Sequence, residues 1–204
     1  MAQLPAAVFR GGWRVSRGEI RHKDVRRLAA RARDDPEAFA ALYDLYVDRV
    51  HAYAYRFLGS TAEAQDVTSQ AFLTALANIR RFRWRAGGFG AWLFRIARNQ
   101  AISTLRQQAR LGPFLDTGTL GSDPEEEAAR RETLVRLRAL VAELPPRQRE
   151  AVYLKYSAGL ENPEIAAVTG RSVSAVSSLL HRATARLREG LQNDHEGPEA
   201  DAQA

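Results

Sequence analysis

Apolar side chains recur every three or four residues between Asp35 and Gly59, and this repeat limits the possible folds more than any other feature of the sequence. The spacing places the apolar side chains on one face of an α-helix. Asp35 followed by Pro36 is typical of a helix N-terminus, and Gly59 is typical of a C-terminus. The repeating residues are Phe39, Leu42, Tyr43, Tyr46, Val50, Tyr53 and Phe57. The sequence therefore predicts a long amphipathic helix that buries one face.

The helical pattern continues through the rest of the chain, and no segment alternates in the way of a β-strand. A second helix is predicted from a capping box of Ser60 and Glu63, and a third over residues 89–110. Further helices are predicted over 125–143, over 147–156, from an Asn162 cap to 170, and from about 172 past 188. The pattern places Leu76 and Val173 among the core residues. The predicted fold class is all-α.

The composition changes over residues 112–127, which contain five acidic residues, no basic residue and several glycines and prolines. This composition is typical of a linker and indicates a domain boundary. We therefore predict two small helical domains joined by a flexible acidic linker, with a helix-turn-helix in the C-terminal domain. The predicted segments are a basic flexible arm over 1–34, in which residues 25–33 could form a short helix, an N-terminal domain over 35–111, the linker over 112–127, a C-terminal domain over 128–190 and a disordered tail over 191–204.

The charged residues favour a nucleic-acid partner. The chain has 30 basic against 24 acidic residues, a formal net charge of +6, and Lys23 and Lys155 are the only lysines. Arginine suits phosphate contacts because its planar guanidinium donates two parallel hydrogen bonds. The sequence has no cysteine, which excludes disulfides and cysteine-ligated metals and fits a reducing cytoplasm. No apolar run reaches the length of a membrane span, so we expect no membrane insertion.

Residues 80–110 combine eight arginines with five aromatic residues and contain no acidic residue. Arginine follows a phosphate backbone, and an exposed aromatic ring offers a stacking surface for an unpaired base. The combination favours a protein that holds single-stranded or melting DNA. Trp92 has the spacing of a core residue. Trp84 lies among arginines beside a glycine loop, and both a DNA-facing and a core position stay open for it.

Residues 162–188 predict a helix, a turn that contains Gly170 and a second helix, which is the pattern of a helix-turn-helix. In such a motif the N-terminal part of the second helix faces base edges in the major groove. Arg171, His181 and Arg182 have side chains that reach phosphates or bases. An ordinary helical hairpin would give the same pattern, and a structural role for His181 stays open.

An enzyme is the main rival class. A nuclease or nucleotidyl transferase needs clustered carboxylates that hold a metal near the basic surface. Residues 80–110 contain none, the four histidines show no paired metal spacing, and there is no phosphate-binding loop. We therefore expect no enzymatic activity, no metal and no cofactor. A conventional DNA-binding regulator is the alternative, because its C-terminal half would look much the same.

Two parts of the chain resemble the two domains of bacterial sigma factors. Residues 144–188, LPPRQREAVYLKYSAGLENPEIAAVTGRSVSAVSSLLHRATARLR, are similar to the C-terminal DNA-binding domain of that family. The segments AFAALYDLYVDRVHAYAYRFLG, DVTSQAFLTAL and FGAWLFRIARNQAISTLR resemble its N-terminal promoter-melting domain. The matches keep the family's order and cover about three quarters of the chain. The short linker resembles the extracytoplasmic-function (ECF) group.

The resemblance implies a dissociable initiation subunit of bacterial RNA polymerase that is a monomer when free. In that family the N-terminal domain docks on the polymerase clamp and captures the unpaired strand of the minus-ten element. The C-terminal domain recognises the duplex minus-thirty-five element. The implied partners are core RNA polymerase, promoter DNA as duplex and as unpaired strand, and an anti-sigma factor. The alternative is a helix-turn-helix regulator that acts without joining polymerase.

The resemblance also implies roles for single residues, in three sets. The docking set is Asp66, Ser69, Gln70 and Leu73. The strand-capture set is Arg80, Arg83, Trp84, Arg85, Arg95, Arg98 and Asn99. The duplex-recognition set is Arg171, Ser172, Ser174, Ala175, Ser177, Ser178, His181 and Arg182. Relatives often carry a lysine and an arginine where this chain has Ser177 and Leu179, so we expect weak duplex binding by the C-terminal domain alone.

Overall fold

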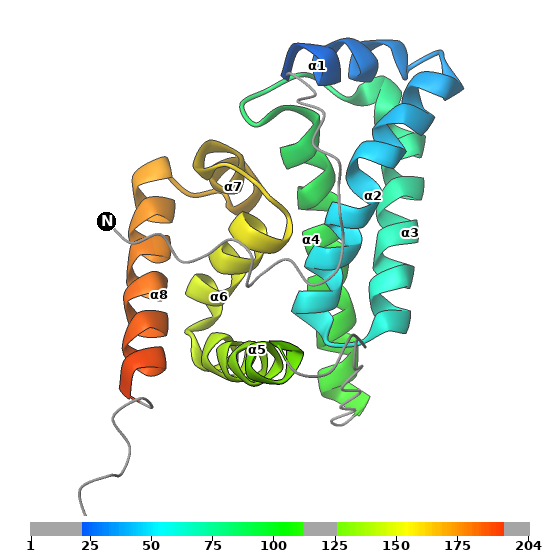
Figure 1. Cartoon of the computed structure of the whole chain (residues 1–204). Coiled ribbons are helices and arrows are strands. Elements are labelled where there is room, and N and C mark those ends of the chain that lie inside the picture. Colours follow the sequence, from blue (N-terminus) through cyan, green and yellow to red (C-terminus); the bar gives the residue numbers. More distant parts are fainter. Residues whose placement is uncertain (1–21, 112–125, 194–204) are drawn as a thin grey trace, which may run out of the picture.

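The computed structural model describes residues 22–111 and 126–193, and the regular structure in these residues is entirely helical (Figure 1). The predicted all-α fold is confirmed. The elements in chain order are α1 (His22–Arg31), α2 (Pro36–Leu58), α3 (Thr61–Asn78), η2 (Ile79–Arg81), α4 (Gly88–Leu111), α5 (Glu126–Glu143), α6 (Pro146–Val152), η3 (Tyr153–Ser157), α7 (Asn162–Thr169) and α8 (Val173–Asn193). Of these, η2 is a short 3₁₀-helix and η3 is a π-helical continuation of α6.

The N-terminal unit, α1 to α4, has three long helices side by side with α1 across one end (Figure 1). The predicted ends of α2 are observed. The Asp35 carboxylate accepts hydrogen bonds from the backbone N–H groups of Glu37 and Ala38, at 3.0 and 3.3 Å. Gly59 ends the helix with φ 79°, a left-handed conformation that glycine adopts at little cost. The apolar face of α2 is buried against α3 and α4, and Tyr53 is fully buried within it.

The short helix that the sequence allows over residues 25–33 is observed as α1, at His22–Arg31, and its packing corrects the prediction of a flexible arm over residues 1–34. Ala29 and Ala32 are buried in the core of the N-terminal unit, with 1% and 5% of their surface exposed. Val25 and Leu28 pack against the same core. The short apolar side chains recur at helical spacing, so this stretch gains a buried face and joins the unit. Residues 1–21 of the predicted arm lie outside the described residues.

The C-terminal unit, α5 to α8, contains the predicted helix-turn-helix in α7 and α8, which are joined at Gly170 with φ 69°. Asn162 is not the cap of α7. The backbone N–H of Glu161 donates to the Glu164 carboxylate at 2.8 Å and closes a capping box one residue earlier. Ser172 caps α8, because its hydroxyl accepts the backbone N–H of Ala175 at 3.2 Å. A small core of the unit's own consists of Leu137, Val141, Leu144, Val152, Ala183 and Leu187.

The two units share a larger core, which the sequence does not predict. Leu154, Leu160 and Ile165 of the C-terminal unit are fully buried in the same cluster as Phe89 and Phe94 of α4. The α7 helix lies against α4, and η3 lies against α2. Figure 1 shows the C-terminal unit stacked beside the N-terminal helices. The units are therefore held together by buried apolar contacts as well as by the chain.

A close approach between the units occurs at Gly87, directly before α4. Its φ of 85° is in the left-handed region. A Cβ at this position would stand 2.5 Å from the Cβ of Ala91 and 3.1 Å from the Cβ of Ala167 in α7. Glycine therefore satisfies both the backbone conformation and the packing of the two units.

Most of the predicted linker and tail lies outside the described residues, which omit 112–125 and 194–204. The last two residues of the predicted linker, Glu126 and Glu127, begin α5. The first residues of the predicted tail, 191–193, end α8. The helix that was predicted over 125–143 therefore includes the end of the predicted linker, and α8 extends three residues into the predicted tail.

Candidate nucleic-acid interface

The segment between α3 and α4 carries the first part of the strand-capture set. Phe82 anchors it, because its ring is buried and lies 6.2 Å from the ring centroid of Trp84 and 4.9 Å from that of Trp92. This aromatic packing fixes the backbone. The side chains of Arg83 and Arg85 are exposed on the segment. The local structure therefore displays arginines around a buried aromatic anchor.

Trp84 is half-buried, which places part of its ring in the core, while its DNA-facing position stays a prediction. It packs against the core through Phe82. The guanidinium of Arg26, in α1, lies 5.8 Å from the centroid of its ring, a distance that allows a cation–π contact. The indole is thus fixed by the core and by α1 while part of its surface remains accessible.

Arg80 and Arg83 hold the segment through backbone carbonyls. Arg80 donates to the carbonyl of Arg33 at 3.1 Å and forms an ion pair with Asp34 at 3.2 Å. Arg83 donates to the carbonyls of Arg80 and Phe82, each at 3.3 Å. The Arg80 and Arg83 side chains remain exposed, so these contacts orient them without hiding them.

The second part of the strand-capture set lies further along α4 and faces the C-terminal unit. Arg98 pairs with the Glu150 carboxylate through two hydrogen bonds, at 2.6 and 3.2 Å. The Arg98 and Glu150 side chains are 25% and 12% exposed. Arg95 donates to the carbonyl of Ala167 in α7. Asn99 is exposed. The structure does not bring Arg95 and Arg98 together with Trp84 as one open surface.

Electrostatics at this interface follow from burial. The hydrogen-bonded Glu150 carboxylate raises the pKa of Arg98, whose charged form it stabilises. Burial raises the pKa of Tyr53, and the Glu150 carboxylate raises it further. The Tyr53 hydroxyl has no hydrogen-bond partner among the described residues. An uncharged phenol and a paired guanidinium therefore lie together between the units.

Arg49 makes a second polar contact between the units. Its guanidinium donates to the backbone carbonyls of Ala158 and Gly159, at 2.8 and 3.3 Å. It also lies 4.9 Å from the ring centroid of Tyr46 and 5.9 Å from that of Phe94. Because this arginine lies on α2, contacts from two helices of the N-terminal unit, α2 and α4, hold the C-terminal unit in place.

The duplex-recognition set lies on α8 and the turn before it, and most of it is open. Ser172, Ser174, Ser177, Ser178, His181 and Arg182 are exposed, and Arg171 and Ala175 are partly exposed. A shallow depression on this face is lined by Ser177, Ser178, His181 and Arg182. The amide of Asn162 donates to the Ser177 hydroxyl at 3.1 Å. The predicted recognition residues therefore form one face, on which small serine side chains lie around His181 and Arg182.

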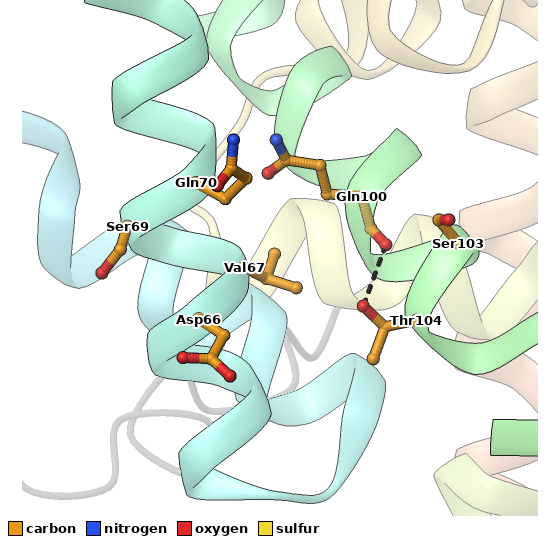
Figure 2. Close-up of a pocket in the computed structure, with 7 residues that line it drawn as sticks. All are labelled: Asp66, Val67, Ser69, Gln70, Gln100, Ser103 and Thr104. Atoms are coloured by element: carbon orange, nitrogen blue, oxygen red, sulfur yellow. Dashed lines mark hydrogen bonds between the residues drawn. The ribbon is translucent and has the colours of Figure 1, made fainter. Parts of the chain in front are cut away.

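The docking set lies on α3, beside a hollow between α3 and α4 (Figure 2). Asp66, Ser69 and Gln70 line it from α3, and Gln100, Ser103 and Thr104 line it from α4. Gln100 donates to the Thr74 hydroxyl at 3.2 Å, and Thr104 donates to the Gln100 carbonyl at 3.2 Å. Figure 2 shows Ser69 pointing away from α4. The α3 helix has two acidic residues and no basic one, in contrast to the arginine-rich segment that follows it.

The face of α3 that carries the docking set also contains an apolar residue, Leu76, that was predicted in the core. Leu76 is 49% exposed rather than buried, beside Leu73 at 59% and Tyr43 at 42%. Val173, also predicted in the core, is 46% exposed. The sequence feature that could have placed Leu76 on the surface is its position three residues after Leu73, on the same stripe of α3 as Asp66 and Ser69. Exposed leucines in such a stripe are typical of a protein-binding face.

Neither a metal centre nor a membrane span is found in the part of the chain that the structure describes. No group of three or more histidine or carboxylate side chains there is placed to hold a metal ion. No described helix combines the length and the apolar character needed to cross a bilayer.

Models of known protein families match both halves of the chain. The family model of Sigma-70 region 2 matches residues 42–111, and that of Sigma-70, region 4 matches residues 134–187. The first match contains the docking and strand-capture sets, and the second contains the duplex-recognition set.

Individual relatives agree with the family models. The ECF RNA polymerase sigma factor BldN of Streptomyces coelicolor is 36% identical over 165 residues, which cover 78% of this chain and 62% of BldN. The chain therefore spans less than two thirds of BldN. The ECF RNA polymerase sigma factor SigL of Mycobacterium tuberculosis is 32% identical over 171 residues, covering 81% of this chain and 96% of SigL. The structure of CnrH in complex with the cytosolic domain of CnrY matches with a TM-score of 0.64 at 30% identity, over 83% of this chain and 97% of that chain.

Proposed function

Because the chain belongs to the ECF sigma factors of RNA polymerase, we propose that it joins core polymerase, directs it to specific promoters and helps to open the DNA. The observation that carries this proposal is the presence of both sigma regions in one chain, each with a distinct candidate face. A DNA-binding regulator would share the helix-turn-helix and would not need the arginine–aromatic segment. Polymerase supplies the chemistry, and this protein supplies recognition.

The proposed work is divided between the two units. The α8 face would contact duplex DNA in the upstream promoter element, because its small side chains permit a close approach to base edges. The arginines and Trp84 of the N-terminal unit would hold the unpaired strand. Extruding a base costs a few kcal/mol, and stacking on an aromatic ring offsets about 1–3 kcal/mol of that cost.

Polymerase docking is assigned to the stripe of α3 that carries Asp66, Ser69, Gln70 and Leu73. The acidic character of α3 favours a basic partner surface, and its exposed leucines favour an apolar one. We add Leu76 to this stripe because it is half exposed there. The CnrH structure contains a protein partner, and we propose that an anti-sigma factor binds this chain too. We expect the free protein to be a cytoplasmic monomer.

Strand capture by Arg98 requires a change in the described arrangement. Its side chain is mostly buried and paired with Glu150, whereas Arg95 is exposed and bonded to the Ala167 carbonyl. A phosphate would have to replace the Glu150 carboxylate at Arg98. The proposed function therefore includes a separation of the two units when the protein engages polymerase and promoter.

The test is transcription in vitro with bacterial core polymerase, with and without this protein, on a pool of promoters from its own genome. Defined start sites that depend on the protein are the expected result, because the polymerase would then be positioned by it. Sequence-specific DNA binding without any stimulation would favour a regulator that does not join polymerase. Absence of both would reject the proposed function.

A further inference from the structure

The α1 helix precedes the part of the chain that matches Sigma-70 region 2, which begins at residue 42. The family match therefore gives it no role. It is nevertheless part of the N-terminal unit, because Ala29 is buried in the core and Val25 and Leu28 pack beside it. Because α1 lies next to the segment that carries Trp84, its exposed side chains belong to the same candidate DNA-binding surface.

Three polar contacts fix the α1 end of the chain to that segment. Arg33 donates to the carbonyl of Phe82 at 2.8 Å, and Arg80 donates to the carbonyl of Arg33 at 3.1 Å. Arg80 also pairs with Asp34 at 3.2 Å. The contacts join residues nearly fifty positions apart, so α1 and the segment that carries Trp84 form one surface.

The arginines of this helix divide into two kinds. The Arg31 guanidinium pairs with the Asp35 carboxylate at 2.6 Å, so its charge is partly neutralised. Arg26 and Arg27 are exposed and form no ion pair among the described residues. The Arg26 guanidinium lies 5.8 Å from the centroid of the Trp84 ring. One exposed cation, Arg26, therefore stands beside the aromatic side chain that would stack a base, and a second, Arg27, follows it on the same helix.

We infer that α1 is a second wall of the strand-binding site, in which Arg26 and Arg27 contact the phosphates of the unpaired DNA strand whose base stacks on Trp84. This inference rests on the proposed function. The ligand class is single-stranded DNA, recognised through its backbone and one stacked base. A phosphate is a better partner for Arg26 than the indole, because it brings a full opposite charge.

The experiment measures binding of the holoenzyme to a promoter duplex with a pre-melted minus-ten region, over a range of salt concentrations. For single strands the slope of log affinity against log salt is about 0.7 per phosphate contact. The Arg26→Ala/Arg27→Ala variant should lower this slope by about 1.4 and the affinity by about 10- to 30-fold near 0.1 M salt. Arg31→Ala is the matched control, because it removes the same charge from the same helix and should leave the slope nearly unchanged.

The outcomes separate this inference from the proposed function. Wild-type holoenzyme that transcribes normally, together with equal salt slopes for the double variant and the wild type, would overturn the role of α1 alone. A loss of affinity at an unchanged slope would also overturn it, because α1 would then only support Trp84 mechanically. A wild type that directs no transcription would remove the proposed function and this inference with it. Arg26→Lys should retain most of the slope, since the charge remains.

Discussion

The duplex-recognition face and the strand-capture face of this protein differ in what covers them. Most of the duplex-recognition set on α8 is exposed, with Arg182 beside a shallow depression. In the strand-capture set, Arg95 and Arg98 are bonded to α7 and α6. Both faces carry basic side chains with hydrogen-bond donors. Their charge alone would therefore suggest that both are equally accessible to DNA. In the proposed function, duplex recognition by α8 would therefore need no rearrangement of the described units, whereas strand capture through Arg98 would need one.

This difference suggests an order of events on the promoter. The exposed α8 face can meet duplex DNA first. Binding to polymerase and promoter then supplies the free energy that separates the units and releases the α4 arginines. A ligand shifts such an equilibrium only by its difference in affinity for the two arrangements. The shared core and the polar contacts set how large that difference must be.

The largest expected effect comes from a change in the shared core. Leu160→Ala should lower the free energy of unfolding by about 2–5 kcal/mol, because it leaves a cavity where a fully buried leucine joins the two units. Chemical denaturation measures the change, and small-angle scattering measures the radius of gyration. The matched control is Leu187→Ala, in the core of the C-terminal unit only. An equal increase in the radius of gyration of both variants would mean that the shared core does not hold the units together.

Trp84→Ala tests whether strand capture can be lost while duplex recognition is kept. Stacking is worth about 1–3 kcal/mol per base, so open-complex formation should fall by roughly 10- to 100-fold. Permanganate footprinting of melted DNA measures this step. Initial binding to the closed promoter should stay near the wild-type level. A similar loss in both steps would remove Trp84 from the strand site, and Trp84→Phe should preserve most of the opening.

The Arg98–Glu150 pair tests how firmly the strand-capture face is held. A double-mutant cycle with Arg98→Ala and Glu150→Ala should give a coupling free energy of about 1–2 kcal/mol, since the two hydrogen bonds lie in a mostly buried interface. Thermal unfolding of the full chain measures it. The Lys155–Glu161 pair is the control, because Glu161 is 75% exposed and should couple more weakly. Equal coupling free energies in both cycles would mean that the Arg98–Glu150 pair does not specifically hold the two units together.

The smallest expected effect is at the open duplex face. Arg182→Ala should weaken binding to the upstream element by a few-fold for all sequences and lower the salt slope by about 0.9, the value for one phosphate contact on duplex DNA. Fluorescence anisotropy with a duplex of the element, at several salt concentrations, measures both. Ser178→Ala, on the same face, should leave the slope unchanged. Normal transcription from a promoter that depends on this element would exclude the contact.

Local signals predicted several helix ends, whereas long-range contacts were missed, and the roles of the site residues stay predictions. The predicted Asp35 cap and the Ser172 cap form because each side chain reaches a backbone N–H two or three residues away. Asn162 failed as a cap because its amide bonds Ser177, fifteen positions later in the chain. The Arg98–Glu150 pair joins positions 52 residues apart, and no spacing rule finds it.

Apolar residues were the second source of error, because helical spacing does not say which of two apolar stripes is buried. Leu76 on α3 has the spacing of a core residue and lies on the surface. The arm over residues 1–34 failed in the opposite direction. A short helix over 25–33 was anticipated within it, but its packing was not, and Ala29 and Ala32 are sufficient to bury one side. The amount of apolar surface was therefore a poor guide, and its position on the helix decided the outcome.

Gly87 has a practical consequence for engineering this protein. Its missing side chain leaves room for Ala91 on one side and for Ala167 of the C-terminal unit on the other, at 2.5 and 3.1 Å from where a Cβ would stand. A single methyl group at this position would force Ala91 in the first turn of α4 to move and would crowd Ala167 of α7, on a backbone conformation that favours glycine. Gly87→Ala is therefore a substitution that strains the contact between the units without altering any charge.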